Sequence, residues 1–300
     1  MGAPRAARSS TSPPGPPPGT PRAVPAPCPR PQGESSLASL ERTLAAVGDG
    51  GKLVRLPEQV FDASFLSVKH AASGAAVRFD ALGALEGWRR ADLPPVRVSV
   101  AEEWQASRAK DIGEGVQVVE YDWTYTTDYT GTLLQRPGST GGQEGVAFAD
   151  TATHSVDRGM LLARDPILWY DDVPLFESEM DDNGVCQCSV KARVMPRCFL
   201  VLFRFFLRVD GVVVRLRETR LFAKWDAPGA GAGAGPGGGG GGPARLVREV
   251  KWASGDGERL AACGASIGAP AFADADSAAQ ALAAVAPACT DLYKVQVAEL

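Results

Sequence analysis

Residues 198–209 read CFLVLFRFFLRV, an apolar run broken only by Arg204 and Arg208. A strand that is apolar on both faces lies inside a sheet, where other layers cover it above and below. Turn-forming residues bound this run: Met195-Pro196-Arg197 precedes it and Asp210-Gly211 follows it. The pattern predicts a central strand around which the rest of the chain is organised.

Neighbouring segments extend this run into a predicted four-stranded meander. The other three strands are expected over residues 166–177, 185–194 and 212–222. Asn183-Gly184 and Asp210-Gly211 are typical of hairpins closed by type I′ turns, in which both central residues have positive φ. Because side chains alternate between the two faces of a strand, Leu216 and Glu218 are expected to share one face.

Two segments lack the large apolar side chains that a core requires. Residues 1–33 are rich in Pro, Ala, Ser and Arg, which predicts a disordered tail. Residues 227–243 consist of glycine, alanine and proline, which predicts a flexible loop inserted between two strands. The remaining residues, 34–226 and 244–300, are expected to form one α+β domain. Its predicted architecture is layered antiparallel β-sheets, sandwich-like, with flanking helices.

A second strand signal lies upstream of the meander. Residues 121–129 read YDWTYTTDY, in which aromatic and small polar side chains alternate. This period of two predicts a strand, and its aromatic face is expected to pack into the core. Asp122 and Asp128 fall on the opposite face, where two interpretations stay open: a solvent-facing side or a polar groove.

Charge and cysteine content restrict the class of protein. The net charge is −4, and the first 33 residues hold four arginines and no acid. The rest is therefore acidic, which argues against nucleic acid as a partner and favours a basic protein partner. No apolar run reaches the ~18 residues of a membrane span, so no membrane is expected. Six cysteines, three of them in predicted strands, favour free thiols in a reducing compartment.

Candidate chemical sites are few. Cys186 and Cys188 could be thiolate ligands or core thiols, but zinc needs a second ligand pair that the chain does not supply. The acidic stretch that begins at Asp171 and Asp172 lacks calcium-loop spacing, so an acidic face for a protein partner is favoured over a cation site. No nucleophile elbow or phosphate loop is present. We expect no catalytic residue, cofactor or metal; a hydrolase with a groove of Asp122, Asp128, Asp171 and Asp172 is the alternative.

Longer motifs carry a family resemblance. They are LPEQVF (56–61), YDWTYTTDYTGTL (121–133), LFE (175–177) with DNG (182–184), SVKARVMP (189–196), and LRVDG (207–211) with TRL (219–221). Together they resemble the TIPRL family of type 2A phosphatase-interacting regulators of TOR signalling. The resemblance covers roughly residues 52–225 and, more weakly, residues 245–296.

The resemblance implies a non-enzymatic regulator with layered antiparallel sheets and a groove on one side. It implies binding to the catalytic subunit of type 2A-family phosphatases, in opposition to the Tap-forty-two/alpha-four partner, in the cytosol and also in the nucleus. Matching positions imply partner contacts at Val156, Leu216 and Glu218, to which we add the acidic residues Asp171 and Asp172. A scaffold that binds another protein is the remaining alternative.

Two departures from the family pattern stand out. Gly83 occupies a position where the family has an acid, which removes one expected contact. The family also begins with a short tryptophan-containing strand, whereas the first tryptophan here is Trp88. Either the N-terminal tail replaces that strand or one sheet edge is left uncovered.

Overall fold

Three reversals fold the centre of the chain into the expected meander. The computed structural model describes residues 56–71, 73–89, 97–98, 121–122, 125–134, 146–180, 183–224, 245–265, 270–285 and 287–300. The meander consists of β10 (Trp169–Ser178), β11 (Gly184–Val194), β12 (Cys198–Val209) and β13 (Val213–Lys224). All neighbouring pairs are antiparallel. The predicted strand positions are therefore confirmed to within a few residues.

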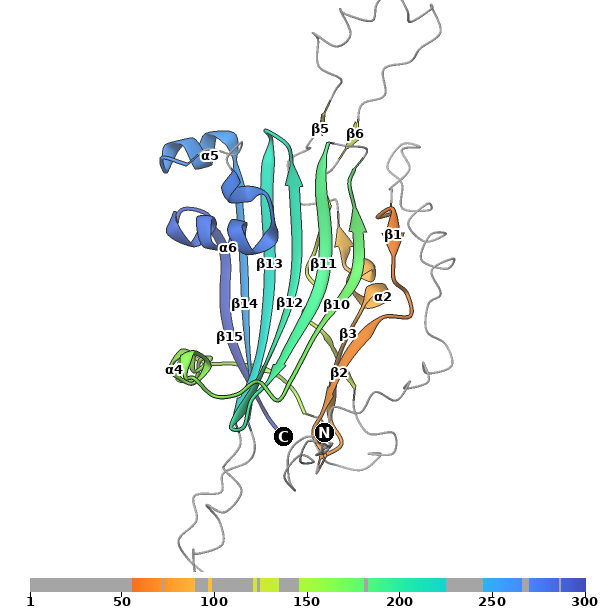
Figure 1. Ribbon diagram of the computed structural model, residues 1–300, viewed down its shortest axis with the longest axis vertical. Helices are drawn as coiled ribbons and strands as arrows, with labels where there is room; N and C mark the ends of the chain where they lie inside the picture. Colours follow the sequence, from red (N-terminus) through yellow and green to blue (C-terminus); the bar gives the residue numbers. More distant parts are fainter. Residues whose placement is uncertain are drawn as a thin grey trace, which may run out of the picture.

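Four further strands widen the meander into an eight-stranded sheet (Figure 1). They are β1 (Gln59–Val60), β9 (Ala149–Asp150), β14 (Arg245–Asp256) and β15 (Thr290–Glu299). The sheet order is β1-β10-β11-β12-β13-β14-β15-β9. Strand β14 pairs with β13 directly, with Phe222 opposite Val247. The expected pairing of strands on either side of the glycine tract is thus confirmed.

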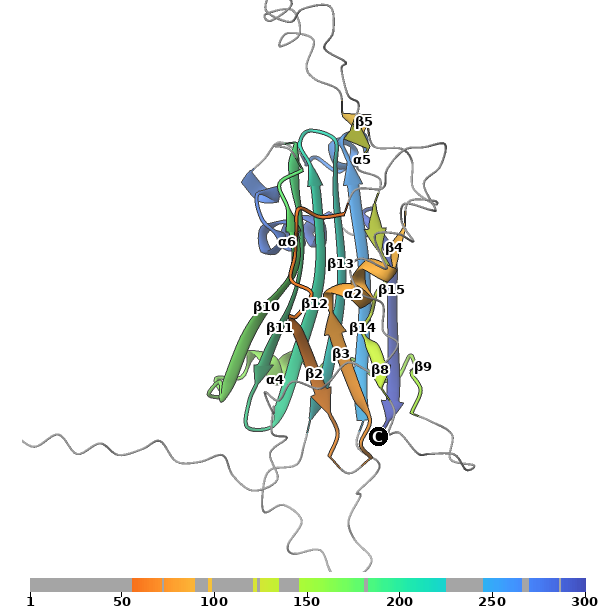
Figure 2. The same cartoon turned by 90° about the vertical axis from the view of Figure 1, so that its right-hand side faces the viewer.

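A smaller layer packs on one side of this sheet, which we call the core face (Figure 2). It contains the three-stranded sheet of β2 (Phe65–Lys69), β3 (Ala76–Asp80) and β8 (Thr132–Leu134), and the helix α2 (Ala81–Glu86). The Asp80 side chain caps α2 by accepting from the backbone N–H of Gly83 at 2.8 Å. Aromatic rings join the layers: Phe79 stacks on Phe203 with ring centroids 5.5 Å apart.

The described helices cover part of the opposite side of the large sheet, which we call the helix face. Helices α5 (Gly257–Ala262) and α6 (Ala275–Ala284), with the 3-10 turn η2 (Pro270–Phe272), cover one end. The short α4 (Arg158–Leu162) covers the other end. In the described part of the chain, no helix is long and apolar enough to cross a membrane.

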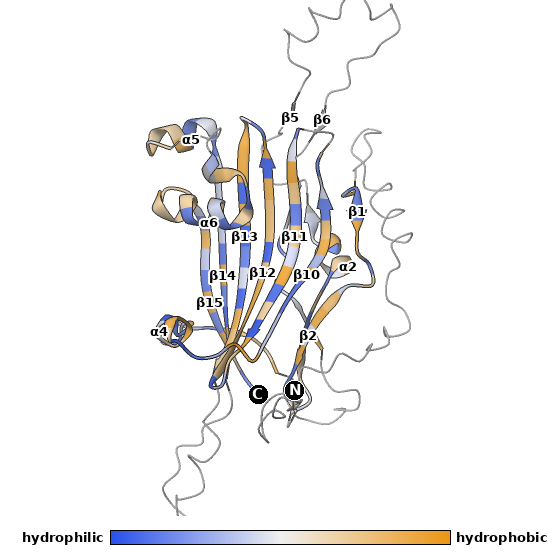
Figure 3. Cartoon of the chain, viewed as in Figure 1, coloured by the Kyte–Doolittle hydropathy of each residue, from blue (hydrophilic) through white to orange (hydrophobic). Residues whose placement is uncertain are grey.

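Strand β12 shows why the meander is central. Phe203, Phe205 and Leu207 pack into the core face, while Phe206 packs under α6 on the helix face. Figure 3 shows apolar and polar bands alternating along the meander strands. Successive side chains of a strand point to opposite faces of the sheet, so the two kinds of band belong to different faces. The α+β class with layered antiparallel sheets and flanking helices is confirmed. The domain limits, residues 1–33 and 227–243 included, lie outside the described residues and stay predictions.

The hairpin connections differ from the predicted type I′ turns. Gly184 and Gly211 have positive φ, but among the described non-glycine residues only Met180 does, so Asn183 and Asp210 do not fit that turn type. Gly184 has a steric reason: a Cβ there would lie 2.0 Å from the carbonyl oxygen of Arg208. The glycine is thus required by close strand approach rather than by a two-residue turn.

The predicted strand over residues 121–129 is discontinuous. It is divided between β6 (Tyr121–Asp122), which pairs with β5 (Arg97–Val98), and β7 (Thr126–Thr127), which pairs with β4 (Trp88–Arg89). Its aromatic residues still face the core where they are described: Tyr125 stacks on Trp88 at 4.7 Å. The expected helix over residues 36–47 lies outside the described residues.

Candidate partner-binding surface

Strand β13 presents two of the predicted contact residues on the helix face. Leu216 and Glu218 share this face, as the period of two predicts, and each is 2% exposed. Leu216 packs with Phe206, Ala278 and Leu282 beneath α6. The Leu216 side chain therefore belongs to the apolar seam between the helix and the sheet.

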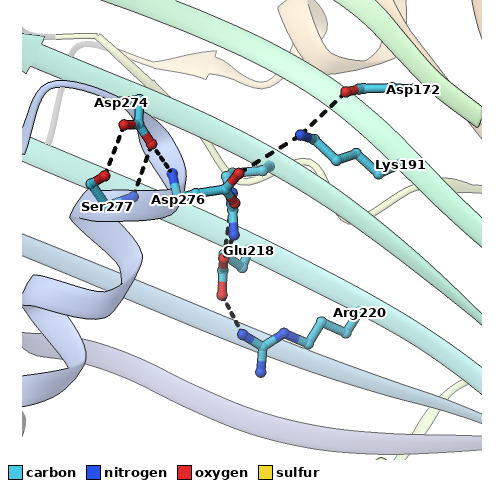
Figure 4. A network of polar contacts seen from close by, with 8 residues as sticks. Asp172, Lys191, Glu218, Arg220, Asp274, Asp276 and Ser277 are labelled. Atoms are coloured by element: carbon cyan, nitrogen blue, oxygen red, sulfur yellow. Dashed lines mark hydrogen bonds and ion pairs between the residues drawn. The ribbon is translucent and has the colours of Figure 1, made fainter. Parts of the chain in front are cut away.

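Glu218 is held between two arginines (Figure 4). Its Oε1 accepts from Arg204 Nε at 2.9 Å and from Nη2 at 2.6 Å, and its Oε2 accepts from Arg220 Nη2 at 2.7 Å. The two-pronged contact with Arg204 is the geometry in which guanidinium–carboxylate pairs are strongest. A buried carboxylate is tolerated here because both of its oxygens are satisfied by positive donors.

The ion pairs continue from Arg204 towards the outer strands. Arg204 Nη1 donates to Asp276 on α6, so it bridges the helix to the sheet. Lys191 on β11 lies 4.0 Å from Asp276 and 3.2 Å from the Asp172 carboxylate on β10. Asp274 caps α6 by accepting from the backbone N–H groups of Asp276 and Ser277. The start of α6 is thus fixed over this part of the sheet.

The same network runs in the other direction to Val156. Arg220 Nη1 lies 3.9 Å from Glu249 Oε2 on β14, and Glu249 Oε1 accepts from the backbone N–H of Val156 at 2.9 Å. Val156 precedes α4 and is itself buried, against Met195 and Phe222. We call the seven charged residues the sheet-face network: Asp172, Lys191, Arg204, Glu218, Arg220, Glu249 and Asp276.

A small hollow opens beside the network. It encloses about 150 Å³ between β11, β12 and the first turn of α6, and Lys191, Arg204 and Asp276 line it together with Gln187 and Ser189. Farther along the same face, Tyr293 on β15 is exposed. Partial burial and the Glu249 carboxylate both raise the pKa of its phenol. The centre of the helix face, between the described helices, is therefore polar, with charges of both signs.

The chemistry of this surface does not resemble a catalytic or metal site. Burial raises the pKa of the Cys186 and Cys188 thiols, as expected for core thiols rather than ligands. Within the described residues no three His, Cys, Asp or Glu side chains cluster as metal ligands. Two positions of the hydrolase alternative lie on β10: Asp172 pairs with Lys191 on the helix face, and Asp171 caps the N–H of Asp172 from the edge. The Asp128 carboxylate lies instead beside Gly87, at the end of α2 in the smaller layer. The Asp122 side chain lies outside the described residues.

Comparison with known proteins gives the family. A sequence model of the TIP41-like family matches residues 59–252, more than half of the chain. The chain belongs to the TIP41-like family. It is similar to the TIP41-like protein of Arabidopsis thaliana, with 34% identity over 77% of each chain. It is also 42% identical to the human TIP41-like protein over 57% of this chain and 60% of the human one.

One more TIP41-like relative carries an informative name. The Saccharomyces cerevisiae protein called type 2A phosphatase activator TIP41 is 32% identical over 58% of this chain and 51% of its own length. The resemblance to the TIPRL family is therefore confirmed. The name of the yeast relative refers to regulation of a phosphatase rather than to an enzymatic activity of that protein.

The structure brings together three of the five predicted contact residues of this TIP41-like chain. Asp172 and Glu218 belong to the sheet-face network, and the Val156 backbone binds it. Leu216 lies next to Glu218 but under α6, and Asp171 projects at the sheet edge instead. Val156, Leu216 and Glu218 are buried in the free chain, so their role in partner contact stays a prediction.

Sequence reasoning missed the cationic half of this TIP41-like surface. Arg204, Arg220 and Lys191 hold the acids in place, and Asp276 connects them to α6. One signal was available: Arg204 is one of only two charged residues in the central strand, and a buried arginine is rarely left without a partner. The identity of that partner depends on strand register, which the pattern of one strand does not define.

The pairing of Asp276 with Arg204 predicts a pH-dependent tether. The Arg204 hydrogen bond holds the pKa of Asp276 below its ordinary 3.8. A carboxyl group whose pKa is lower in the folded state than in the unfolded state stabilises the fold at pH values above its unfolded-state pKa. This stabilisation is lost as the pH falls through its folded-state pKa. Asp276→Asn should lower the free energy of unfolding by about 0.5–1 kcal/mol at pH 7, since the aspartate is largely exposed.

Urea unfolding at several pH values checks this tether. The difference between Asp276→Asn and the unsubstituted chain should shrink as the pH is lowered from about 5 towards 2. Glu258→Gln, at an exposed carboxylate on α5, is the control and should show little effect at neutral pH. A constant difference at all pH values would mean that the Asp276 charge does not hold the helix.

Proposed function

We propose that this chain is a non-catalytic regulator that binds the catalytic subunit of type 2A-family protein phosphatases. The observation that carries the proposal is family membership, together with relatives in two yeasts that are named type 2A phosphatase activators. The polar centre of the helix face is the proposed contact surface. It is rigidly held by paired charges, and rigid placement reduces the entropy that binding costs.

The proposed mechanism is differential binding. A regulator that binds one state or assembly of the phosphatase more tightly than another shifts the population towards that state. On this surface, Lys191 and Asp172 are partly exposed and can contact a partner, whereas Glu218 is buried and holds Arg204 and Arg220 in position. Leu216 and Val156 would act in the same indirect way, by fixing α6 and the segment before α4.

Binding to the purified catalytic subunit tests the proposal directly. Biolayer interferometry with the full chain should show saturable binding, and no binding at micromolar concentration would refute the function. Lys191→Glu should weaken binding about tenfold, which corresponds to about 1.4 kcal/mol. Lys294→Glu is a matched control because Lys294 also lies 3.2 Å from an aspartate, Asp150, but belongs to the opposite face.

The outcomes distinguish whether the chain binds the phosphatase from which surface it uses. If the unsubstituted chain binds and both lysine variants bind equally well, the phosphatase contact lies away from Lys191. If Lys294→Glu alone weakens binding, the core-face side of β15 is the contact. Phosphatase activity measured in the same titration would show whether the bound catalytic subunit gains or loses activity.

The proposal extends to a role in TOR signalling in the cytosol and the nucleus, in opposition to the Tap-forty-two/alpha-four partner. It is supported by the family resemblance, and the free thiols of the described cysteines fit a reducing compartment. Co-purification from native extract should recover the phosphatase catalytic subunit with this chain. Recovery of an unrelated protein without the phosphatase would favour the scaffold alternative.

A further inference from the structure

Among the described residues, the first half of β10 is an unpaired edge of the large sheet. Strand β1 covers β10 only at Phe176 and Glu177. No other described strand pairs with the outer side of β10 between Trp169 and Pro174. Figure 2 shows this end of β10 standing at the margin of the sheet, away from β2. Unpaired strand edges are where proteins add a strand from another chain.

The bulge in β10 determines which backbone groups face outward. Beyond the bulge, the Leu175 carbonyl points away from β11, since it accepts from the N–H of Phe61 at 2.9 Å. The register with β11 shifts by one residue between Pro174 and Phe176. Because of this extra residue, the alternation between backbone groups that point towards β11 and those that point away from it changes phase at the bulge. On the free half, Tyr170, Asp172 and Pro174 therefore direct their backbone outward.

The outward groups are nearly all acceptors. Pro174 has no N–H, and the N–H of Asp172 already donates to the Asp171 carboxylate at 2.9 Å. What is left on this edge is the carbonyl oxygens of Tyr170, Asp172 and Pro174, and one N–H, that of Tyr170. An edge of this composition is matched by a segment that brings donors.

The side chains around the edge point to the same occupant. Asp171 and Asp172 are both exposed acids, and Tyr170 and Trp169 are exposed aromatic residues, at 51% and 37%. Ile167 and Leu168 add apolar surface immediately before the strand. Carboxylates attract arginine and lysine, and aromatic faces bind guanidinium and ammonium groups. The carboxylates, the aromatic rings and the outward carbonyl groups of this edge therefore all favour a cationic segment.

We propose that the free edge of β10, from Trp169 to Pro174, binds an extended arginine- or lysine-bearing segment of a partner protein by strand addition. A second copy of this chain fits poorly, because two such edges would oppose carbonyl to carbonyl and aspartate to aspartate. Residues 1–33 of the chain carry arginines, but their many prolines remove the N–H donors that the edge requires. This site goes beyond the proposed phosphatase surface and borders it at Asp172.

Three labelled octapeptides probe the site with the full chain. They alternate valine with arginine, with serine or with glutamate, and fluorescence anisotropy measures their binding. The arginine peptide should bind at least tenfold more tightly than the glutamate peptide. Equal binding of the two would overturn the proposal, because the edge would then lack its preference for cations.

Two substitutions at one position separate backbone from side chain. Tyr170→Pro blocks strand addition without removing a hydrogen bond within the chain, since this N–H faces outward, and should weaken the arginine peptide at least tenfold. Tyr170→Ser keeps the N–H and should weaken it less. Tyr293→Ser, at an exposed tyrosine on another strand, should leave binding unchanged. Unchanged binding by Tyr170→Pro would place the peptide elsewhere and refute the site.

A charge variant keeps the test decisive if proline disturbs the fold. Asp171→Asn retains a side-chain oxygen that can cap the N–H of Asp172 but removes the negative charge. It should weaken the arginine peptide several-fold and leave the serine peptide unaffected. Equal effects on both peptides, or none on either, would show that Asp171 does not select for cations.

Discussion

Glu218→Lys is expected to lower the free energy of unfolding by about 3–5 kcal/mol, the usual effect of removing one partner of a buried ion pair. Glu218 is 2% exposed and is the only described acid that contacts Arg204 and Arg220 together. A lysine there would place a third cation between the buried Arg204 and the partly exposed Arg220, and Arg204 would lose its buried acidic partner. Urea unfolding followed by circular dichroism measures the change.

Glu218→Gln is the variant that separates stability from binding. The amide keeps one acceptor oxygen and nearly the same volume, so we expect a smaller loss, about 1–3 kcal/mol. If Glu218 acts by holding Arg204 and Arg220, Glu218→Gln should weaken phosphatase binding while the chain stays folded. Full stability for Glu218→Lys would contradict the buried position of this residue, whatever the binding result.

Phe203→Ala should cost about 3–5 kcal/mol, because it removes the ring that joins the two layers of the fold. Phe203 is fully buried and stacks on Phe79, and the Tyr129 ring contacts it edge-on with centroids 5.5 Å apart. The cavity left behind would lie between the large sheet and β3, where neither layer can close it without moving as a whole. Denaturant unfolding gives the magnitude.

A double-mutant cycle tests whether the layers are coupled through these rings. The effects of Phe79→Ala and Phe203→Ala should fail to add, with a coupling of about 0.5–1.5 kcal/mol. Phe206→Ala is a matched control, since Phe206 is equally buried on the same strand but packs under α6. Combining it with Phe79→Ala should give additive effects. Coupling as large as that of Phe203 would place the two faces of β12 in one cooperative unit.

The meander could be predicted from the sequence because its signals are local. The run of residues 198–209, the turn residues beside it and the period of two in β13 all act within a few residues of one another. The predicted type I′ turns were wrong, since neither Asn183 nor Asp210 has positive φ. Gly184 is required instead by its close approach to the carbonyl oxygen of Arg208 on the next strand, a contact that the turn sequence alone does not reveal. The strand over residues 121–129 is divided because its two halves pair with different short strands.

The candidate site shows the limit of such reasoning. Periodicity placed Leu216 and Glu218 on one face, and that is confirmed by the packing of Leu216 under α6 and the contact of Glu218 with Arg204. Leu216 is buried by α6, which comes much later in the chain, after β14. The partners of Glu218 depend on register across β12 and β13. No pattern within one strand contains that information.

The pairing of β13 with β14 has a consequence for how this chain can evolve. The two strands are in register at Phe222 and Val247, and the glycine tract between them is predicted from the sequence to be a flexible loop. Closing a loop of twice the length costs only about 0.6 kcal/mol more. Repeat expansion or loss in the glycine tract is therefore nearly neutral for the fold, and its length can drift between lineages while both strands stay in place.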